Sequence, residues 1–199
     1  PPKSTPRRLN KMQSYYFPFY REIPPLNEQI ANALENAKKS ENDKTSKKGN
    51  IIILGNRGSG RSTLGIDIAK ALSAEKKAPV VKVAKIYAAD LNKKDIPATI
   101  GKIAGGVLII EEAGDLNDTV VETLTKAMDF RTDGLVIILE DEPKYIADML
   151  KRHRAFAEKF NSEIVIPIFT NEELVLFGKI YALDHDYKIA EGAEEELYN

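Results

Sequence analysis

The chain has 199 residues, of which 43% are hydrophobic and 30% are charged, and its formal net charge is −1 at pH 7. These values are typical of a soluble globular protein with one well-buried core, and the balanced charge provides no global field that would attract nucleic acid or an acidic membrane. The absence of cysteine excludes a disulfide framework and a thiolate metal site. The longest apolar runs, such as GGVLII, have the length of a strand and not of a membrane span.

Residues 1–14, PPKSTPRRLNKMQS, are polar, basic and interrupted by prolines, which is typical of a tail or linker. They contain no apolar stretch of signal-peptide form, so we expect a soluble, cytoplasmic protein. Because the chain starts at Pro1 without a methionine, we also expect it to be a piece of a longer protein.

The aromatic strip, YYFPFY at residues 15–20, follows this tail. We expect it to dock onto the surface of the domain, because an exposed patch of this kind invites aggregation. A contact with a neighbouring subunit, or with a preceding part of the protein, is the alternative. A helix is then predicted from Pro25, since Ile30, Leu34 and Ala37 fall on one side of it. Residues 38–49 carry lysines without interleaved aromatic residues, which predicts a solvated loop rather than a nucleic-acid patch.

From residue 50, short apolar runs alternate with helical patterns, as in a parallel α/β sheet flanked by helices. Three of the runs are nearly continuous in Ile, Val and Leu, which is typical of strands covered on both faces. Helices are predicted after the glycine-rich segment at 55–63, from about residue 118, over 143–160 in one or two pieces, and after a capping box formed by Thr170 and Glu173. The five predicted strands are 50–54, 79–85, 106–110, 135–139 and 163–168.

The segment GNRGSGRST at 55–63 fits the phosphate-binding pattern G-x-x-x-x-G-K-[ST] at every position except the lysine. Glycines allow backbone N–H groups to approach phosphates, and the following helix N-terminus adds partial positive charge. A glycine-rich turn without function is disfavoured because the pattern lies between a predicted buried strand and a helix. The candidate nucleotide-binding residues are Asn56, Arg57, Gly58, Ser59, Gly60, Arg61, Ser62 and Thr63.

Arg61 stands at the lysine position of this pattern. Its guanidinium keeps the positive charge but is longer, planar and fork-shaped, so it cannot simply occupy the place of an ammonium. The pattern therefore predicts binding of ATP or ADP, while efficient hydrolysis is a separate question.

The apolar strand predicted at 106–110 ends in Glu111 and Glu112. In P-loop ATPases, a carboxylate here holds Mg²⁺ through water, and the following glutamate orients the attacking water. Ser62 and Glu111 are thus the candidate Mg²⁺ ligands, and Glu112 is the candidate general base. The alternative is a pair of solvated acids that close a strand. The position of Glu111 usually holds aspartate, and the extra methylene crowds a metal that tolerates little distortion.

Three segments in this order, LGNRGSGRSTLG, GGVLIIEEA and IPIFTNEELVLFGKIYALDHDYKIAEGAEEEL, resemble the CbxX/CfqX-type AAA+ ATPases over residues 23 to 199. The resemblance implies a five-stranded P-loop core, a C-terminal helical lid, and assembly into rings that remodel protein partners. It also implies ATP with Mg²⁺ between core and lid, and arginines supplied by the adjacent subunit. We accordingly predict a tail or linker at 1–22, an AAA+ nucleotide-binding core at 23–168 and a partial lid at 169–199.

Several positions depart from the family pattern. Glu140 and Asp141 follow the fourth predicted strand where the family has a small polar residue, and their charge should repel nucleotide unless magnesium or a lysine compensates. Ala157 and Lys159 stand at the two arginine positions of the family's finger motif. Arg152 and Arg154 lie close by and are alternatives as trans-acting cations, or parts of a solvated helix face.

Two functions remain in competition. The first is an ATP-binding subunit of a ring-forming, protein-remodelling AAA+ ATPase with weak or absent hydrolysis in isolation. The second is a pseudo-ATPase that serves as a structural or scaffold subunit, paired with itself or with a related AAA+ subunit. A small-molecule kinase leaves the lid-like C-terminal pattern unexplained, and the charge balance gives no support to a DNA-remodelling protein.

Overall fold

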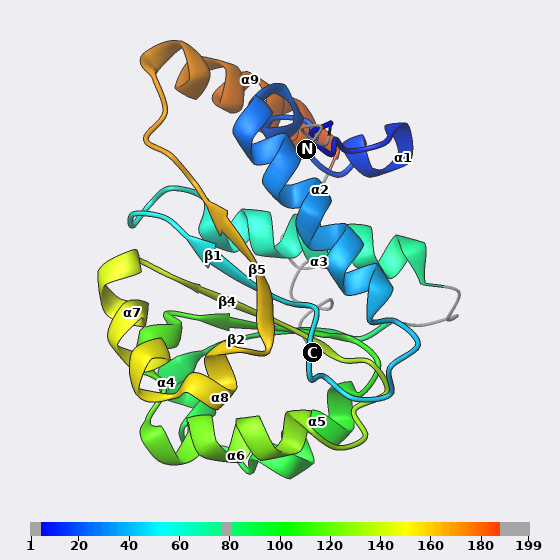
Figure 1. Cartoon of the computed structure of the whole chain (residues 1–199). Coiled ribbons are helices and arrows are strands. Elements are labelled where there is room, and N and C mark those ends of the chain that lie inside the picture. Colours follow the sequence, from blue (N-terminus) through cyan, green and yellow to red (C-terminus); the bar gives the residue numbers. More distant parts are fainter. Residues whose placement is uncertain (1–4, 77–80, 188–199) are drawn as a thin grey trace.

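The computed structural model describes residues 5–76 and 81–187, and in this range a five-stranded sheet forms the centre of the molecule (Figure 1). The strand order is β2-β3-β4-β1-β5, and every neighbouring pair is parallel. This confirms the predicted α/β fold with a parallel sheet. The strands are β1 (Asn50–Leu54), β2 (Val83–Tyr87), β3 (Val107–Glu111), β4 (Val136–Asp141) and β5 (Phe160–Val165).

Helices cover both faces of the sheet (Figure 1). One face packs against α2 (Pro24–Lys39) and α3 (Arg61–Glu75), and the other against α4 (Ala88–Leu91), α5 (Ile96–Ile103), α6 (Asp118–Met128), α7 (Pro143–Arg152) and α8 (Arg154–Ala157). The remaining elements are α1 (Lys11–Ser14), η1 (Tyr20–Glu22), η2 (Ala113–Asp115) and α9 (Asn171–Tyr187). In the described part of the chain, no helix combines the length and the apolarity that a membrane span requires.

The central strands are apolar on both faces because each face has its own core. Ile51 and Ile53 of β1 lie in the core beneath α2 and α3, while Ile52 and Leu54 lie in the core on the opposite side. Successive side chains of a strand point to opposite faces, so a strand buried on both sides becomes a continuous apolar run.

The predicted edge strand and the helix before it are displaced in the structure. The strand predicted at 163–168 is found at Phe160–Val165, and the helical pattern predicted to reach 160 ends at Ala157. Because β5 pairs with β1 alone, only alternate side chains are buried, and Ser162 and Ile164 point inward. The apolar run that suggested the strand continues past the sheet, where Ile168 is 87% exposed. Residues 79 and 80 of the predicted second strand lie outside the described residues.

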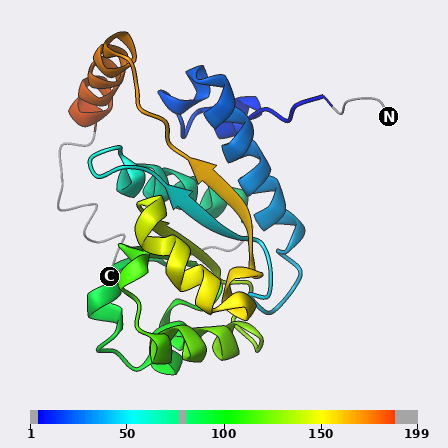
Figure 2. The same ribbon diagram turned by 60° about the vertical axis from the view of Figure 1, so that its left-hand side comes forward.

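The aromatic strip docks onto the core, with Phe17, Phe19 and Tyr20 buried. Phe19 also contacts the helix beyond the sheet: its ring centroid lies 4.7 Å from that of Phe177 in α9 and 5.2 Å from that of Phe169. Figure 2 shows α9 projecting beyond the sheet on the side of the molecule where α2 and the N-terminal segment lie. The predicted domain limits at residues 22 and 168 stay predictions.

The capping box predicted at the start of α9 is present. The Thr170 N–H donates to Glu173 Oε1 at 2.8 Å, and the Glu173 N–H donates to Thr170 Oγ1 at 3.1 Å. This reciprocal pair satisfies two N–H groups that have no partner within the helix.

Candidate functional site

The predicted site residues come together at the carboxyl edge of the sheet. Leu54, the last residue of β1, pairs with Asp141 of β4, and Glu111 of β3 pairs with Glu140 of β4. Ligands of open parallel sheets bind at this edge, where the loops that follow the strands meet. The glycine loop, residues 55–60, leaves β1 here and leads into α3.

The glycine loop has the backbone conformation that a phosphate cradle needs. Gly58 and Gly60 adopt φ values of +80° and +90°, which only glycine adopts without strain. No side chain caps α3, so the N–H groups of its first turn, which include those of Arg61, Ser62 and Thr63, face the loop without a side-chain acceptor.

Polar groups in the loop also suit an anion. Ser59 Oγ is buried and has no hydrogen-bond partner among the described residues. A buried hydroxyl without a partner carries a desolvation cost that a phosphate oxygen would remove. The Asn56 carbonyl accepts from the Ser59 N–H at 3.0 Å and closes the turn. The loop therefore fits a phosphate group.

Arg61 folds back into the loop. Its Nη1 donates to the Gly55 carbonyl oxygen at 2.6 Å and lies 4.0 Å from Asp141 Oδ1, and its side chain is only 12% exposed. A guanidinium has five N–H donors, so this arrangement fixes the side chain while leaving donors beyond the one that Gly55 accepts. Arg61 thus places a positive charge beside the glycine loop, next to Gly55.

Ser62 and Glu111, the two candidate Mg²⁺ ligands, contact each other directly. Ser62 Oγ donates to Glu111 Oε1 at 2.5 Å. The ammonium of Lys85 in β2 then donates to Ser62 Oγ at 2.8 Å and lies 3.1 Å from Glu111 Oε1. A lysine ammonium therefore lies against both oxygens, and in this arrangement Ser62 and Glu111 do not hold Mg²⁺ directly between them.

Two further carboxylates, those of Glu140 and Asp141, are buried behind this group. Asp141 Oδ2 accepts from the Gly114 N–H at 2.8 Å, and its Oδ1 accepts from the Glu142 N–H at 2.7 Å. Glu140 Oε2 has no hydrogen-bond partner within residues 5–76 and 81–187. Burial, and the neighbouring Glu111 charge after it, raises the pKa of Glu140 to about 7.

The remaining predicted residues lie at the rim. Glu112 is exposed, at φ +51° where the chain leaves β3 and enters η2, so its carboxylate is in solvent. The Arg57 N–H donates to Glu142 Oε1 at 3.4 Å, which places a protein carboxylate against the loop.

Two of the three candidate trans-acting cations are engaged within the chain. Lys159 is buried and paired with Asp129, and Arg152 pairs with Asp148 at 2.6 Å and with Asp118 at 3.4 Å. Arg154, the first residue of α8, is exposed. Of the candidates for a trans-acting cation, Arg154 is therefore the one with an exposed side chain and no ion pair in the described residues.

Lys85 is a site residue that the sequence did not reveal. It lies in a strand predicted from its apolar pattern, and pairing of β2 with β3 brings it to Glu111. The strand's alternation could have pointed to it. Val83, Lys85 and Tyr87 share one face of β2, so the charged Lys85 lies on the same face as a valine that packs beneath α3.

The aromatic strip reaches the same loop. The Tyr20 hydroxyl lies 3.5 Å from the Gly60 carbonyl oxygen, and burial raises the pKa of this hydroxyl, with a further contribution from Asp67. Tyr20 thus lies beside the glycine loop with its hydroxyl uncharged. Among the described residues, no group of three or more His, Asp or Glu side chains could hold a metal ion by itself.

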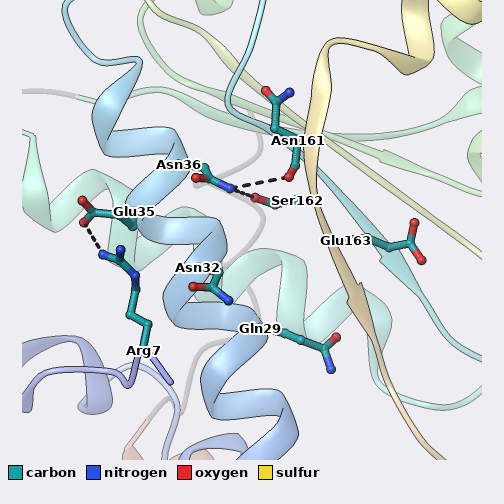
Figure 3. A pocket seen from close by; sticks show the side chains of 8 residues that line it. All are labelled: Arg7, Gln29, Asn32, Glu35, Asn36, Asn161, Ser162 and Glu163. Atoms are coloured by element: carbon teal, nitrogen blue, oxygen red, sulfur yellow. Dashed lines mark hydrogen bonds and ion pairs between the residues drawn. The ribbon is translucent and has the colours of Figure 1, made fainter. Parts of the chain in front are cut away.

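A separate cavity of about 310 Å³ lies between α2 and β5 (Figure 3). Its polar groups largely satisfy one another: Asn36 Nδ2 donates to Ser162 Oγ at 2.8 Å, and Arg7 pairs with Glu35 at 3.3 Å. No predicted site residue faces this cavity. It is lined by Arg7, Gln29, Asn32, Glu35, Asn36, Asn161, Ser162 and Glu163.

No protein-family model matches the chain, and no curated protein matches it. Its fold is similar to that of RuvB from Thermotoga maritima in two solved structures of RuvB variants. One match has a TM-score of 0.58 and 19% identity over 82% of this chain and 51% of that one. The other has a TM-score of 0.54 and 19% identity over 76% and 47%.

The chain thus spans about half the length of these structures. The resemblance to the narrower CbxX/CfqX-type group stays a prediction. Strand order, loop placement and these neighbours agree: the chain has the fold of an AAA+ P-loop NTPase.

Proposed function

We propose that this chain is a nucleotide-binding module that binds ATP or ADP through residues 56–63 and hydrolyses ATP weakly or not at all in isolation. The observation that carries the proposal is the glycine loop between β1 and the uncapped N-terminus of α3, with Gly58 and Gly60 in the left-handed region. A helix N-terminus and convergent backbone N–H groups favour phosphate.

Weak hydrolysis follows from the groups around the loop. Glu111 is paired with Lys85, Glu112 lies in solvent, and Lys159 pairs with Asp129 within the chain. An arginine finger, where one is used, contributes about 10³–10⁵ in rate. Loss of that contribution alone would leave turnover negligible.

The partners follow from the fold by analogy. We propose self-association, or pairing with a related AAA+ subunit, and action on a protein partner rather than on nucleic acid, given a net charge of −1. A pseudo-ATPase scaffold subunit is the second candidate. It is favoured by the internal pairing of the site, in which Glu142 accepts from the Arg57 N–H and Lys85 holds Glu111.

Replacing Arg61 by alanine is expected to weaken ATP and ADP binding about 10- to 100-fold, since a hydrogen bond to a charged group contributes about 1.5–3 kcal/mol. The measurement is titration calorimetry of the wild type and the variant with each nucleotide. Arg61→Lys keeps the positive charge and should lower the affinity for each nucleotide less than Arg61→Ala does. Arg131→Ala is the matched control, because Arg131 precedes β4 at the opposite edge of the sheet and its side chain is 79% exposed. No binding to the wild type would overturn the proposed function.

Replacing Glu112 by glutamine is expected to leave phosphate release unchanged at the background rate, because its carboxylate is exposed where the chain leaves β3 and no hydrogen bond in the described residues holds it toward the glycine loop. A coupled assay of phosphate release on both proteins checks this. Wild-type turnover that disappears in Glu112→Gln would contradict the assignment as a weak or inactive ATPase, while leaving nucleotide binding intact.

A further inference from the structure

Lys85 lies at the centre of the polar cluster under the first turn of α3. Its ammonium contacts Ser62 Oγ at 2.8 Å and Glu111 Oε1 at 3.1 Å, and its side chain is 24% exposed. Val83, Lys85 and Tyr87 share one face of β2, and Glu111 and Glu140 follow on the same face of β3 and β4. The sheet itself therefore fixes the lysine beside the carboxylates.

In this arrangement the two candidate metal ligands do not both bind one Mg²⁺ directly. Octahedral Mg²⁺ holds its oxygens at 2.0–2.1 Å, so two adjacent ligand oxygens lie about 2.9 Å apart. Ser62 Oγ and Glu111 Oε1 are 2.5 Å apart and joined by a hydrogen bond. The serine hydroxyl donates to this carboxylate directly, and the Lys85 ammonium lies against both oxygens.

Charge in the cluster favours the same arrangement. Glu111, Glu140 and Asp141 are each no more than 5% exposed, and Arg61 and Lys85 are the cations whose fields act on Glu140. Removing the Lys85 charge would leave Glu140 with Arg61 as the cation that acts on it among the described residues. Since buried charges persist only when paired, Lys85 is needed for this site to exist without a metal.

We propose that the Lys85 ammonium is the resident cation of this site and that the chain binds nucleotide without a divalent metal. This inference rests on the proposed nucleotide-binding function. Lys85 compensates the phosphate charge from the position that a metal takes in other P-loop proteins, and Ser62 and Glu111 hold the lysine instead of a hydrated ion.

The first test is calorimetry with ADP and ATP, in EDTA and in excess Mg²⁺. For the wild type we expect dissociation constants that agree within about twofold between the two conditions. For Lys85→Met in EDTA we expect nucleotide affinity to fall by about 10- to 100-fold, which is the contribution of one charge-assisted hydrogen bond. Lys82→Met is the matched control at the residue just before the same strand, because Lys82 is exposed and its Nζ donates to the Lys102 carbonyl at 2.9 Å. Binding that needs Mg²⁺ in the wild type would overturn the inference and leave the nucleotide site standing.

The second test needs no nucleotide. Mn²⁺ titration followed by electron paramagnetic resonance is expected to show no bound ion in the wild type and a bound ion in Lys85→Ala, where the carboxylates have lost their cation. Equal Mn²⁺ binding by both proteins would overturn the inference. If Mn²⁺ binds the variant alone but neither nucleotide binds the wild type, the proposed function fails while Lys85 keeps its role as resident cation.

Discussion

Replacing Glu140 by glutamine is expected to stabilise the domain at pH 8 by an amount on the order of 3 kcal/mol and to remove a loss of stability that the wild type suffers between about pH 4.5 and pH 7. Glu140 is buried, and its Oε2 has no hydrogen-bond partner in the described part of the chain. Burial and the neighbouring Glu111 raise its folded-state pKa to about 7 from an ordinary value of 4.5.

The sign follows from proton uptake. Because the folded-state pKa of Glu140 is the higher one, the folded protein holds this proton more tightly than the unfolded chain does. The stability that the bound proton provides is therefore fully present below the unfolded value near 4.5 and is lost as the pH rises through about 7. Glutamine is neutral throughout and is insensitive to this range.

The measurement is denaturant unfolding of both proteins from pH 5 to pH 8, read as the difference between them, so that titration of the other acids cancels. Glu122→Gln is the matched control, because Glu122 is exposed on α6 and its carboxylate is hydrated in both states. A wild-type to Glu140→Gln difference that stays constant over this pH range would show that Glu140 is already ionised and paired in the folded protein.

Much of the fold could be predicted because the pattern of apolar residues indicates where the buried strands and helices lie. A strand buried on both faces, such as β1, is apolar at nearly every position, so its limits at residues 50–54 are confirmed. The edge strand β5 could not be placed in this way. Only alternate residues of it are buried, and the apolar residues Ile166 and Ile168 continue beyond its last paired residue.

The glycine loop could likewise be predicted, because its residues are contiguous and two of its glycines mark the positions where the backbone adopts a positive φ. Lys85 could not, since its role depends on which strand lies next to β3 and on the register between them. A lysine within an apolar strand has many possible partners until the sheet order is known. The sequence predicted that the charge of Glu140 and Asp141 would repel nucleotide unless magnesium or a lysine compensated it. In the structure the Lys85 ammonium pairs with Glu111, and its charge acts on Glu140.

Replacing Phe19 by alanine is expected to destabilise the domain by about 3–5 kcal/mol, the usual cost of deleting a buried phenylalanine side chain, and to release α9 from the core. Phe19 is 3% exposed and contacts the rings of Tyr20, Phe169 and Phe177 at centroid distances of 5.3, 5.2 and 4.7 Å. Edge-to-face pairs of this kind contribute about 0.5–1.5 kcal/mol beyond the area they bury.

The Phe19→Ala change should lower the protection of α9 amides more than that of the rest of the domain, because few side chains over residues 171–180 attach this helix to the core. Over residues 171–180 of α9, Leu174, Val175 and Leu176 are between 41% and 59% exposed, while Phe177 and Ile180 pack against the core. A helix held by so few contacts opens locally at a free energy below that of global unfolding. Removing Phe19 takes away a ring that Phe177 packs against.

Hydrogen exchange of α9 amides, measured beside that of α2 amides, distinguishes release of the helix from general loosening. In Phe19→Ala we expect α9 protection to fall further than α2 protection. Tyr15→Ala is the matched control within the same aromatic strip, because Tyr15 is 70% exposed and should change neither quantity. If α9 keeps its protection while stability falls, the strip serves the core alone. If the protection of α9 and the stability of the domain fall together, we infer that the aromatic strip couples α9 to the glycine loop, since Tyr20 beside Phe19 borders Gly60.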